Sequence, residues 1–371
     1  MTESKPRTIE DQLKDILEAD GALRSSRIIR VTPMAGDASN REYFRAELDG
    51  RPSSMVVLRY GDSKGPQFSG EKIAQSDAMH QLSPYLRERG VPVPSLYRYD
   101  AEERIFLFED LGDDALATLA RDTGTAAAER IEQQLGSDWL MKLFRSAIDV
   151  IASYQSLPPD ENTFLFKRGL AFENYRREAS EFTEFFGPTR GIRPAEVQRI
   201  ETLLDGICES IVSIPRKPSH FDFHGFNLLV DRDCQLRVID FQDCSFISEA
   251  RDLVSLVNDR DMDSILGRSR QEALIRYYLE RLKPGAAFQK HYDLTLLHWD
   301  LRVAGRFVKL CQTKKTDRYY EWLPGTLRRL GRTLVRIHRE IHGLDDMLDI
   351  VSRLSGEARE GIADPWPFPT S

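Results

Sequence analysis

The densest group of ionisable and metal-competent side chains lies between residues 219 and 246. Its members are His220, Asp222, His224, Asn227, Asp240 and Asp243. Asn and Asp side chains offer hard oxygen ligands, and Mg²⁺ takes a few of these and completes its octahedral shell with water or substrate oxygens. A nearby carboxylate that is not needed as a ligand, such as Asp222, can accept a proton from an attacking hydroxyl. A metal with a positioned base beside it is the layout that phosphoryl transfer requires.

A hairpin is expected to bring these groups together. Residues 227–230 and 236–239 are strand-like, and the polar residues 231–233 between them suit a turn. In an antiparallel pair the start of one strand lies beside the end of the other, so we expect Asn227 near Asp240. Zinc is the alternative, because His220 and His224 are four residues apart. It is disfavoured, since no helical pattern joins the two histidines and no third soft ligand is evident.

Two segments here carry a family resemblance. HFDFHGFN (220–227) and VIDFQD (238–243) resemble the catalytic loop and metal-binding strand of the aminoglycoside phosphotransferase and choline kinase group, distant relatives of protein kinases. The eighteen-residue step from Asp222 to Asp240 fits that group. The resemblance implies that Asp222 is the catalytic base and that Asn227 and Asp240 bind Mg²⁺. It also implies that Asp252 braces the catalytic loop from the following helix.

Other segments resemble one subgroup, the bacterial kinases that phosphorylate the anomeric hydroxyl of N-acetylmuramate and N-acetylglucosamine in peptidoglycan recycling. These segments are GDASNREYFR, VPVPSLYRYD, FEDLGD, LHWDLRVAGRF and YYEWLPGTLRRL. The resemblance spans about residues 28–335 and implies ATP and Mg²⁺ as cofactors and an amino sugar as the small-molecule substrate. One departure is Ile247-Ser248, where that subgroup tends to have a Gly-Pro pair. Two alternatives stay open: an aminoglycoside, another sugar or an amino alcohol as acceptor, and a nucleotide-binding regulator without transfer.

The first 111 residues offer candidate nucleotide contacts. The pattern G-x-x-x-x-G-K-[ST] does not occur, which argues against a P-loop kinase. Ser39, in the turn 36–40, is a candidate hydroxyl donor to phosphate. In kinase-like folds the junction of the lobes is a hinge, which implies that backbone groups near Glu109 and Leu111 pair with the adenine edge.

The lysine that kinases usually present from the third strand is missing, because this strand reads MVVLRY. Arg59 is the candidate replacement, and its guanidinium can bind phosphate with two parallel donors. Lys64 and Lys72 are alternatives, with Glu71 as a carboxylate that orients the cation. Candidate contacts for a sugar ring are Tyr175, Trp299, Arg302 and Phe307.

The expected secondary structure changes near Gly112 from mixed helices and strands to mostly helices. Before it we expect helices at 9–22 and 68–89, with strands at 27–31, 43–48, 55–60, 95–99 and 104–109. After it, apolar residues recur at helical spacing, with helices expected near 137–157, 171–186, 200–211, 274–282, 293–313 and 325–342. We therefore predict an α+β, bilobal protein-kinase-like fold. Its parts are a nucleotide-binding lobe with an antiparallel sheet (1–111), a mostly helical catalytic and substrate-binding lobe (112–361) and a Pro-rich tail (362–371).

Composition excludes several classes of protein. The chain has 371 residues, and its 52 Lys and Arg against 59 Asp and Glu give a net charge of −7, which argues against a broad nucleic-acid surface. The basic run from Arg328 to Arg339 is expected to be a solvated helix face. Four cysteines without a C-x-x-C pair indicate neither a zinc site nor a disulfide framework. Without a long apolar run or a secretion signal we expect a cytoplasmic protein with no membrane contact, and the oligomeric state stays open.

Overall fold

The computed structural model describes residues 7–21, 23–34, 41–61, 67–339 and 341–355. Within it the chain divides into two compact units. The smaller unit consists of 1–66, 73–113 and 229–242, and the larger unit of 67–72, 114–228 and 243–371. The main boundary between the units follows Asp113. One segment before it in sequence, 67–72, belongs to the larger unit, and one segment after it, 229–242, belongs to the smaller unit.

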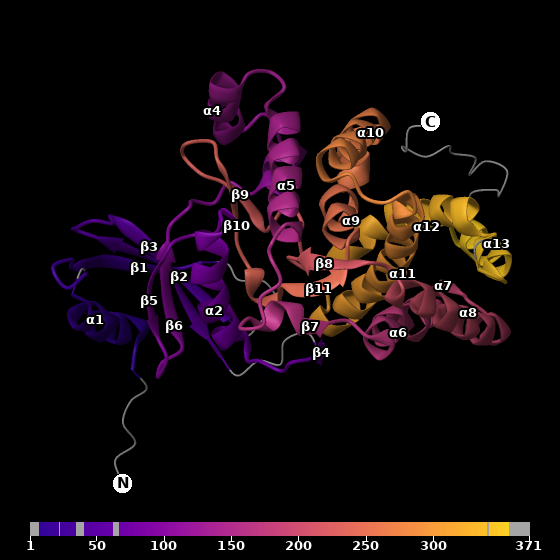
Figure 1. Cartoon of the computed structure of the whole chain (residues 1–371), viewed down its shortest axis with the longest axis horizontal. Coiled ribbons are helices and arrows are strands. Elements are labelled where there is room, and N and C mark those ends of the chain that lie inside the picture. The colour runs from indigo at the N-terminus through magenta and orange to yellow at the C-terminus, as the bar shows by residue number, and fades with distance from the viewer. Residues whose placement is uncertain (1–6, 22, 35–40, 62–66, 340, 356–371) are drawn as a thin grey trace, which may run out of the picture. The chain divides into compact units, whose positions relative to one another are not determined.

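A five-stranded antiparallel sheet forms the smaller unit (Figure 1). In sheet order its strands are β1 (Ile28–Pro33), β2 (Arg41–Leu48), β3 (Ser54–Tyr60), β6 (Ile105–Glu109) and β5 (Leu96–Asp100). Three further elements belong to this unit: α1 (Ile9–Ala19), α2 (Gln75–Glu88) and the strand β10 (Leu236–Val238), which pairs with β9 (Leu228–Val230). The five strands were all expected from the sequence, within a few residues at their ends.

Helix α1 covers one face of this sheet. Its apolar stripe of Leu13, Ile16 and Leu17 packs with alternate residues of the central strands, among them Ala46 and Val57. Successive side chains of a strand point to opposite faces. Side chains at the odd positions of β3, and at the even positions of β2, therefore share the α1 face.

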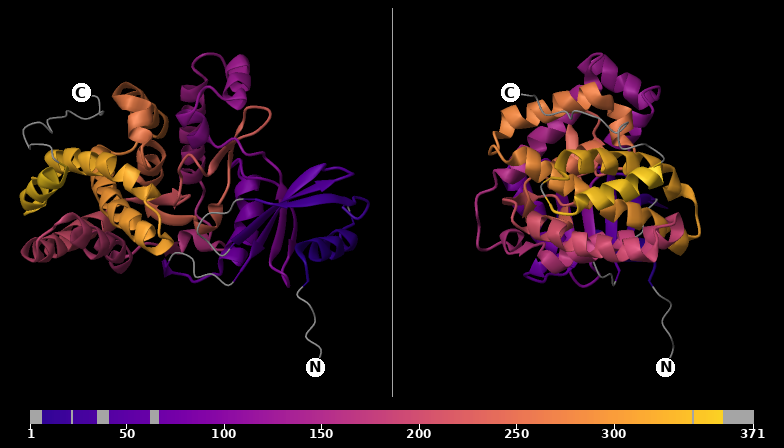
Figure 2. Two further views of the ribbon diagram at one scale, coloured as in Figure 1. Left: turned by 180° about the vertical axis from the view of Figure 1, so that it is seen from behind. Right: turned by 90° about the vertical axis from the view of Figure 1, so that its right-hand side faces the viewer.

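The larger unit is mostly helical. Its principal helices are α5 (Trp139–Gln155), α6 (Phe172–Glu181), α8 (Pro194–Val212), α9 (Arg251–Asn258), α10 (Met262–Leu282), α11 (Phe288–Lys314), α12 (Leu323–Ile337) and α13 (Leu344–Ser355). Shorter elements are α3 (Leu116–Arg121), α4 (Ala126–Leu135), α7 (Gly187–Arg190) and the strand pairs β8 (Arg216–Ser219) with β11 (Ser245–Ser248) and β4 (Ser69–Gly70) with β7 (Arg168–Gly169). Helices α11 and α12 run side by side in both views of Figure 2.

Several elements differ from the expectation. Helix α2 begins at Gln75 rather than near residue 68, because Ser69 and Gly70 pair with β7, and it continues through Pro84. The short helices α3 and α4 had not been expected, since six and ten residues are too few for a clear apolar period.

The basic run on α12 is not a solvated face along its whole length. Arg329 is 4% exposed and donates to the fully buried Asp300 at 2.6 Å. Arg336 is also largely buried and donates to Asp293 at 2.7 Å. The expectation was wrong for these two residues because the acidic partners lie on α11, far away in the sequence.

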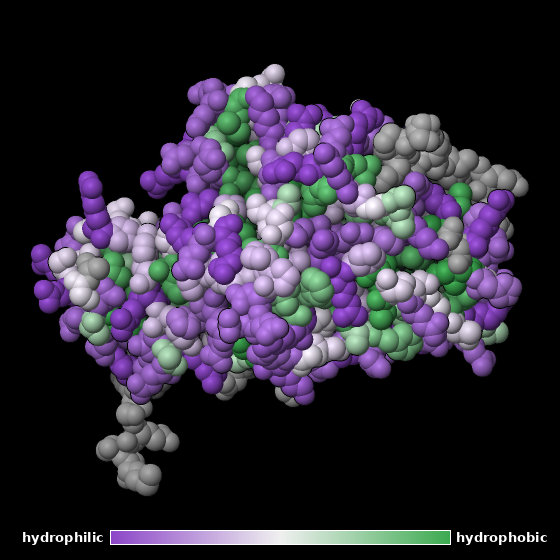
Figure 3. Space-filling model, viewed as in Figure 1, coloured by the Kyte–Doolittle hydropathy of each residue, from purple (hydrophilic) through white to green (hydrophobic). Residues whose placement is uncertain are grey.

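The face shown in Figure 3 is mostly hydrophilic, with smaller apolar areas between the polar side chains. Only Ile29 and Tyr97 are large hydrophobic residues classed as exposed among the described residues. Within that same part of the chain, no helix combines the length and apolar character needed to cross a membrane.

Close packing of α11 gives a first prediction. A Cβ atom at Gly305 would clash with the backbone of Glu181 and Phe182, so Gly305→Ala should lower the free energy of unfolding by about 1–3 kcal/mol. Urea denaturation would measure this loss. The matched control is Gly325→Ala on α12, where the new methyl has room and should be neutral or stabilising by up to about 1 kcal/mol. Equal stability of the Gly305→Ala protein and the wild type would contradict the close contact.

Candidate active site

The loop from His220 to Asn227 is held by one buried carboxylate. Asp252, near the start of α9, accepts hydrogen bonds from the backbone N–H of His220 at 2.8 Å and of Phe221 at 3.2 Å. Burial raises the pKa of Asp252 to about 7, although these two hydrogen bonds act to lower it. The predicted bracing role of Asp252 is thereby confirmed.

The backbone beside Asp222 adopts an uncommon conformation. Phe221 has φ of 84°, in the left-handed region that non-glycine residues rarely occupy. Its ring packs against Phe68 at 5.1 Å between centroids and under the Arg251 guanidinium at 5.0 Å. Such strain persists only where the surroundings hold it, and here packing and the Asp252 clamp do so.

Gly225 fixes the loop to α3. The Ala117 N–H donates to the Gly225 carbonyl at 3.0 Å, and a Cβ at Gly225 would lie 2.9 Å from the Ala117 nitrogen. A larger residue would therefore push the loop away from the helix.

Asp222 is partly buried and ionised. Its carboxylate accepts no hydrogen bond from any residue that the structure describes. Burial by itself would raise the pKa of Asp222, but the neighbouring His224, Arg302 and Arg251 lower it to about 2. A charged carboxylate with open lone pairs can accept a proton, but a pKa this low makes it a weak base, because general-base catalysis is most effective when the pKa lies near the operating pH.

Asn227 is oriented so that its amide oxygen stays available. Its Nδ2 donates to the backbone carbonyl of Asp222 at 2.9 Å, and its backbone N–H donates to the His224 carbonyl at 2.9 Å. The amide oxygen is therefore the atom left to bind a metal, and amide and carboxylate oxygens are ligands that suit Mg²⁺. Asn227 belongs to the larger unit and Asp240 to the smaller one, and their joint Mg²⁺ site stays a prediction.

Asp240 follows β10 in the smaller unit and has φ of 63°. Its carboxylate forms an ion pair with Arg41 of β2. The strand before it is fixed to the same unit, since Val238 N–H donates to the Pro92 carbonyl at 2.9 Å and Arg237 donates to Glu109 at 2.8 Å.

The predicted adenine contacts lie at the end of β6. Glu109 is held by its side chain, which accepts hydrogen bonds from the Ser95 N–H at 3.0 Å and the Ser95 hydroxyl at 2.9 Å. The Leu111 N–H and carbonyl make no hydrogen bond with any residue in the described ranges. These backbone groups are thus available to a ligand, and their role toward adenine stays a prediction.

The predicted phosphate contacts are placed less favourably. Ser39 and Lys64 lie outside the described residues. Arg59 donates to Glu42 at 2.7 Å and to Gln12 of α1 at 2.9 Å. Lys72 is exposed. The carboxylate of Glu71 lies 3.6 Å from the amino group of Lys167.

A buried charged cluster surrounds the sugar-contact candidates in the larger unit. The Arg302 Nε lies 3.6 Å from the Glu178 carboxylate, and its guanidinium lies 5.2 Å from the Trp299 ring centroid. Arg251 lies 4.7 Å from the same ring. Burial would raise the pKa of Glu178, but Arg302 and Arg251 lower it.

Tyr175 joins this cluster through His298, whose Nε2 lies 2.9 Å from the Tyr175 carbonyl, whereas Phe307 packs with Tyr319 and Trp322. Sequence reasoning missed Glu178 and Arg251. Arg251 directly precedes the bracing Asp252, and this adjacency was the one available signal.

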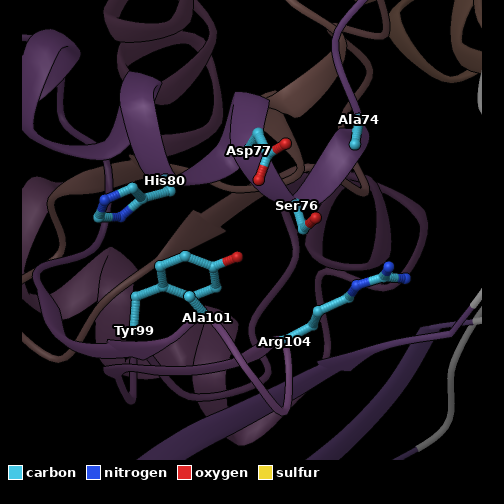
Figure 4. A pocket seen from close by; sticks show the side chains of 7 residues that line it. All are labelled: Ala74, Ser76, Asp77, His80, Tyr99, Ala101 and Arg104. Atoms are coloured by element: carbon cyan, nitrogen blue, oxygen red, sulfur yellow. The ribbon is translucent and has the colours of Figure 1, made fainter.

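A separate pocket of about 590 Å³ lies in the smaller unit (Figure 4). Its lining comes from the start of α2 and the β5–β6 turn, including Asp77, His80, Tyr99 and Arg104. The His80 and Tyr99 rings lie 4.6 Å apart. None of the predicted site residues lines it.

These observations agree with what the chain resembles. Residues 30–288, well over half of the chain, match the model of the phosphotransferase enzyme family, APH. The chain belongs to this family. It is therefore an ATP-dependent phosphotransferase that acts on a hydroxyl acceptor. No curated protein matches the sequence.

Solved structures share the fold of this phosphotransferase. Choline kinase LicA from Streptococcus pneumoniae is 12% identical with a TM-score of 0.58, covering 87% of this chain and 98% of its own. APH(2")-IIa in its complex with gentamicin is 13% identical with a TM-score of 0.55, covering 88% and 97%. A choline/ethanolamine kinase family protein from Mesorhizobium loti is 13% identical with a TM-score of 0.54, covering 92% and 99%. The predicted α+β, bilobal kinase-like fold is confirmed.

The Asp252 clamp gives a second prediction for this phosphotransferase. Asp252→Asn presents an N–H₂ group to one backbone donor, so it should lower the free energy of unfolding by about 2–3 kcal/mol at pH 8, where the wild-type carboxylate is mostly ionised. Urea denaturation and the turnover number would both be measured. The matched control is Asp205→Asn, which removes a surface ion pair to Arg176 and should cost less than about 1 kcal/mol. A loss no larger than in this control would show that the clamp does not hold the loop.

Proposed function

We propose that this protein transfers the γ-phosphate of ATP to the anomeric hydroxyl of an amino sugar. The substrate class is N-acetylmuramate and N-acetylglucosamine, and the product is a sugar 1-phosphate formed in the cytoplasm during peptidoglycan recycling. The observation that carries the proposal is the sign of the charge around Asp222. His224, the partly buried Arg302 and the buried Arg251 lie close enough to lower its pKa.

The charge of these neighbours favours an acceptor that is not cationic. A cationic acceptor such as an aminoglycoside or choline calls for a carboxylate-rich site. Glu178 is the carboxylate beside Arg302, and it is already compensated by Arg302 and Arg251. Guanidinium groups suit hydroxyl-rich and carboxylate-bearing ligands, because they present several N–H donors in a planar fork. N-acetylmuramate carries both kinds of group.

Buried polar atoms without a hydrogen bond in the same cluster support a polyhydroxyl ligand. Arg251 Nη2 and Trp299 Nε1 make no hydrogen bond with any described residue, and Arg302 Nε and Glu178 Oε2 make none either, although these two atoms form an ion pair 3.6 Å apart. Buried polar groups in native proteins are almost always paired. A sugar, which both donates and accepts, provides suitable partners for such a mixed set.

The mechanism follows from the state of each residue. Asp222 is ionised before substrate binds, so it can take the proton of the acceptor hydroxyl as the oxygen attacks the γ-phosphorus and the bond from this phosphorus to the bridging β–γ oxygen breaks, with ADP as the leaving group. Asp252 and Gly225 keep the loop in place, so the base does not have to be ordered during the reaction. Mg²⁺ bound by Asn227 and Asp240 would neutralise phosphate charge.

The role of Asp222 gives a third prediction. Asp222→Asn removes the base but keeps the shape of the side chain, so turnover should fall about 10²–10⁴-fold with little change in nucleotide affinity. Coupled ADP release and calorimetry would measure the two quantities. The matched control is Asp149→Asn, which removes a half-exposed carboxylate paired with Arg281 and should leave turnover unchanged. Near wild-type turnover in Asp222→Asn would remove this residue from the mechanism.

The acceptor gives a fourth prediction. In an ADP-release screen with N-acetylmuramate, N-acetylglucosamine, kanamycin and choline, the two amino sugars should turn over and the two cations should not, because the residues near Asp222 include two arginines. Phosphorus NMR of the product should show the coupling of a phosphate on the anomeric position. Turnover of kanamycin or choline alone would replace the amino-sugar assignment with a cationic acceptor. ATP binding without transfer to any acceptor would instead favour a regulator.

A further inference from the structure

The two faces of the small sheet carry different arginines. The cross-strand pairs Arg41↔Tyr60 and Glu42↔Arg59 set the register of β2 and β3. Arg59 shares its face with Met55 and Val57, which pack in the α1 core. Arg41 and Arg45 alternate with the α1-facing residues of β2 and therefore belong to the opposite face.

All three arginines have a carboxylate partner, and for two of them this partner has no predicted role in the site. Arg59 lies on the α1 side and donates to Glu42 and Gln12. Arg45 donates to both oxygens of Asp110, at 2.9 and 3.1 Å, and to both oxygens of Asp113, at 2.8 Å each. Neither Asp110 nor Asp113 is a predicted metal ligand.

Arg41 differs because its partner has a second predicted role. It forms an ion pair with Asp240, and its side chain is only 12% exposed. Asp240 is the predicted Mg²⁺ ligand of the same unit. In the absence of nucleotide, the Arg41 guanidinium compensates the negative charge of Asp240. When nucleotide is bound, the metal would compensate this charge instead.

A change of partner at Asp240 has a consequence for Arg41. If the carboxylate turns to the metal, the ion pair between Arg41 and Asp240 is broken, and the loss of a carboxylate beside a guanidinium that is only 12% exposed is unfavourable. The phosphate oxygens that enter with the metal are the anions that can replace it, and a guanidinium binds them with two parallel N–H donors. We propose that Arg41, rather than Arg59, is the phosphate-binding cation of this protein and fills the role of the missing lysine. This inference rests on the proposed ATP-dependent transfer.

Binding measurements without turnover test the proposal. Calorimetry would give the affinities of wild type and Arg41→Gln for adenosine and for a non-hydrolysable ATP analogue with Mg²⁺. Removal of the guanidinium should weaken the ATP analogue roughly 10–100-fold. Adenosine has no phosphate, so its affinity should not change. The matched control is Arg30→Gln on β1, which removes an exposed arginine paired with Glu47 and should change neither affinity.

The possible outcomes are distinct. Equal affinity of Arg41→Gln and wild type for the ATP analogue would overturn the proposal, as would a loss seen with Arg59→Gln instead. An equal loss for adenosine and the analogue would also overturn it, because Arg41 would then act only by holding the site together. Should Arg41→Gln not fold, Arg41→Lys keeps the charge without the fork and should show a smaller, phosphate-dependent loss. A wild type that binds no nucleotide would overturn the ATP-dependent function itself, whereas failure of every sugar acceptor would leave the Arg41 result standing.

Discussion

The paired hydrogen bonds from the His220 and Phe221 N–H groups to Asp252 are the interaction on which the site depends. They hold two successive peptide groups immediately before Asp222, and one of those residues is in the left-handed region. A carboxylate that is buried without a cation bonded to it is costly, and its raised pKa reflects that cost. The loop gains a fixed backbone in return, and the positions of Asp222, Gly225 and Asn227 all follow from it.

The larger unit also contains ion pairs between helices that lie outside this loop. Glu181 binds Arg306 and Lys309, and Arg329 binds Asp300 and Asp263. The Arg329–Asp300 pair is buried, so removal of one partner leaves the other uncompensated and costs more than the pair contributes to stability, whereas Arg306 and Lys309 are each 39% exposed and their pairs contribute less. The helices around the catalytic loop are therefore held in specific registers by charge as well as by apolar packing.

Much of the fold could be predicted from local sequence patterns. The strands of the sheet are rich in β-branched or aromatic residues, and the long helices have a clear apolar period. The buried pairs of Arg329 and Arg336 could not be predicted, because each depends on an acidic residue one helix away. Asp222 and Asp252 could be proposed because they lie in segments that resemble family motifs, whereas Glu178 has no motif and became visible only through its contact with Arg302. The face of the sheet on which Arg59 lies could be assigned only from the register of β3, which a sequence alone does not give.

The return of residues 229–242 to the smaller unit bears on how the chain folds during synthesis. When the ribosome has made the first 113 residues, the five-stranded sheet is complete in sequence, yet Glu109 and Arg41 still lack Arg237 and Asp240. More than a hundred residues of the larger unit are made before these partners emerge. The smaller unit therefore reaches its final form only after the whole catalytic loop, residues 220–227, has been synthesised, and a fragment that ends at Asp113 would lack the Asp240 partner of Arg41.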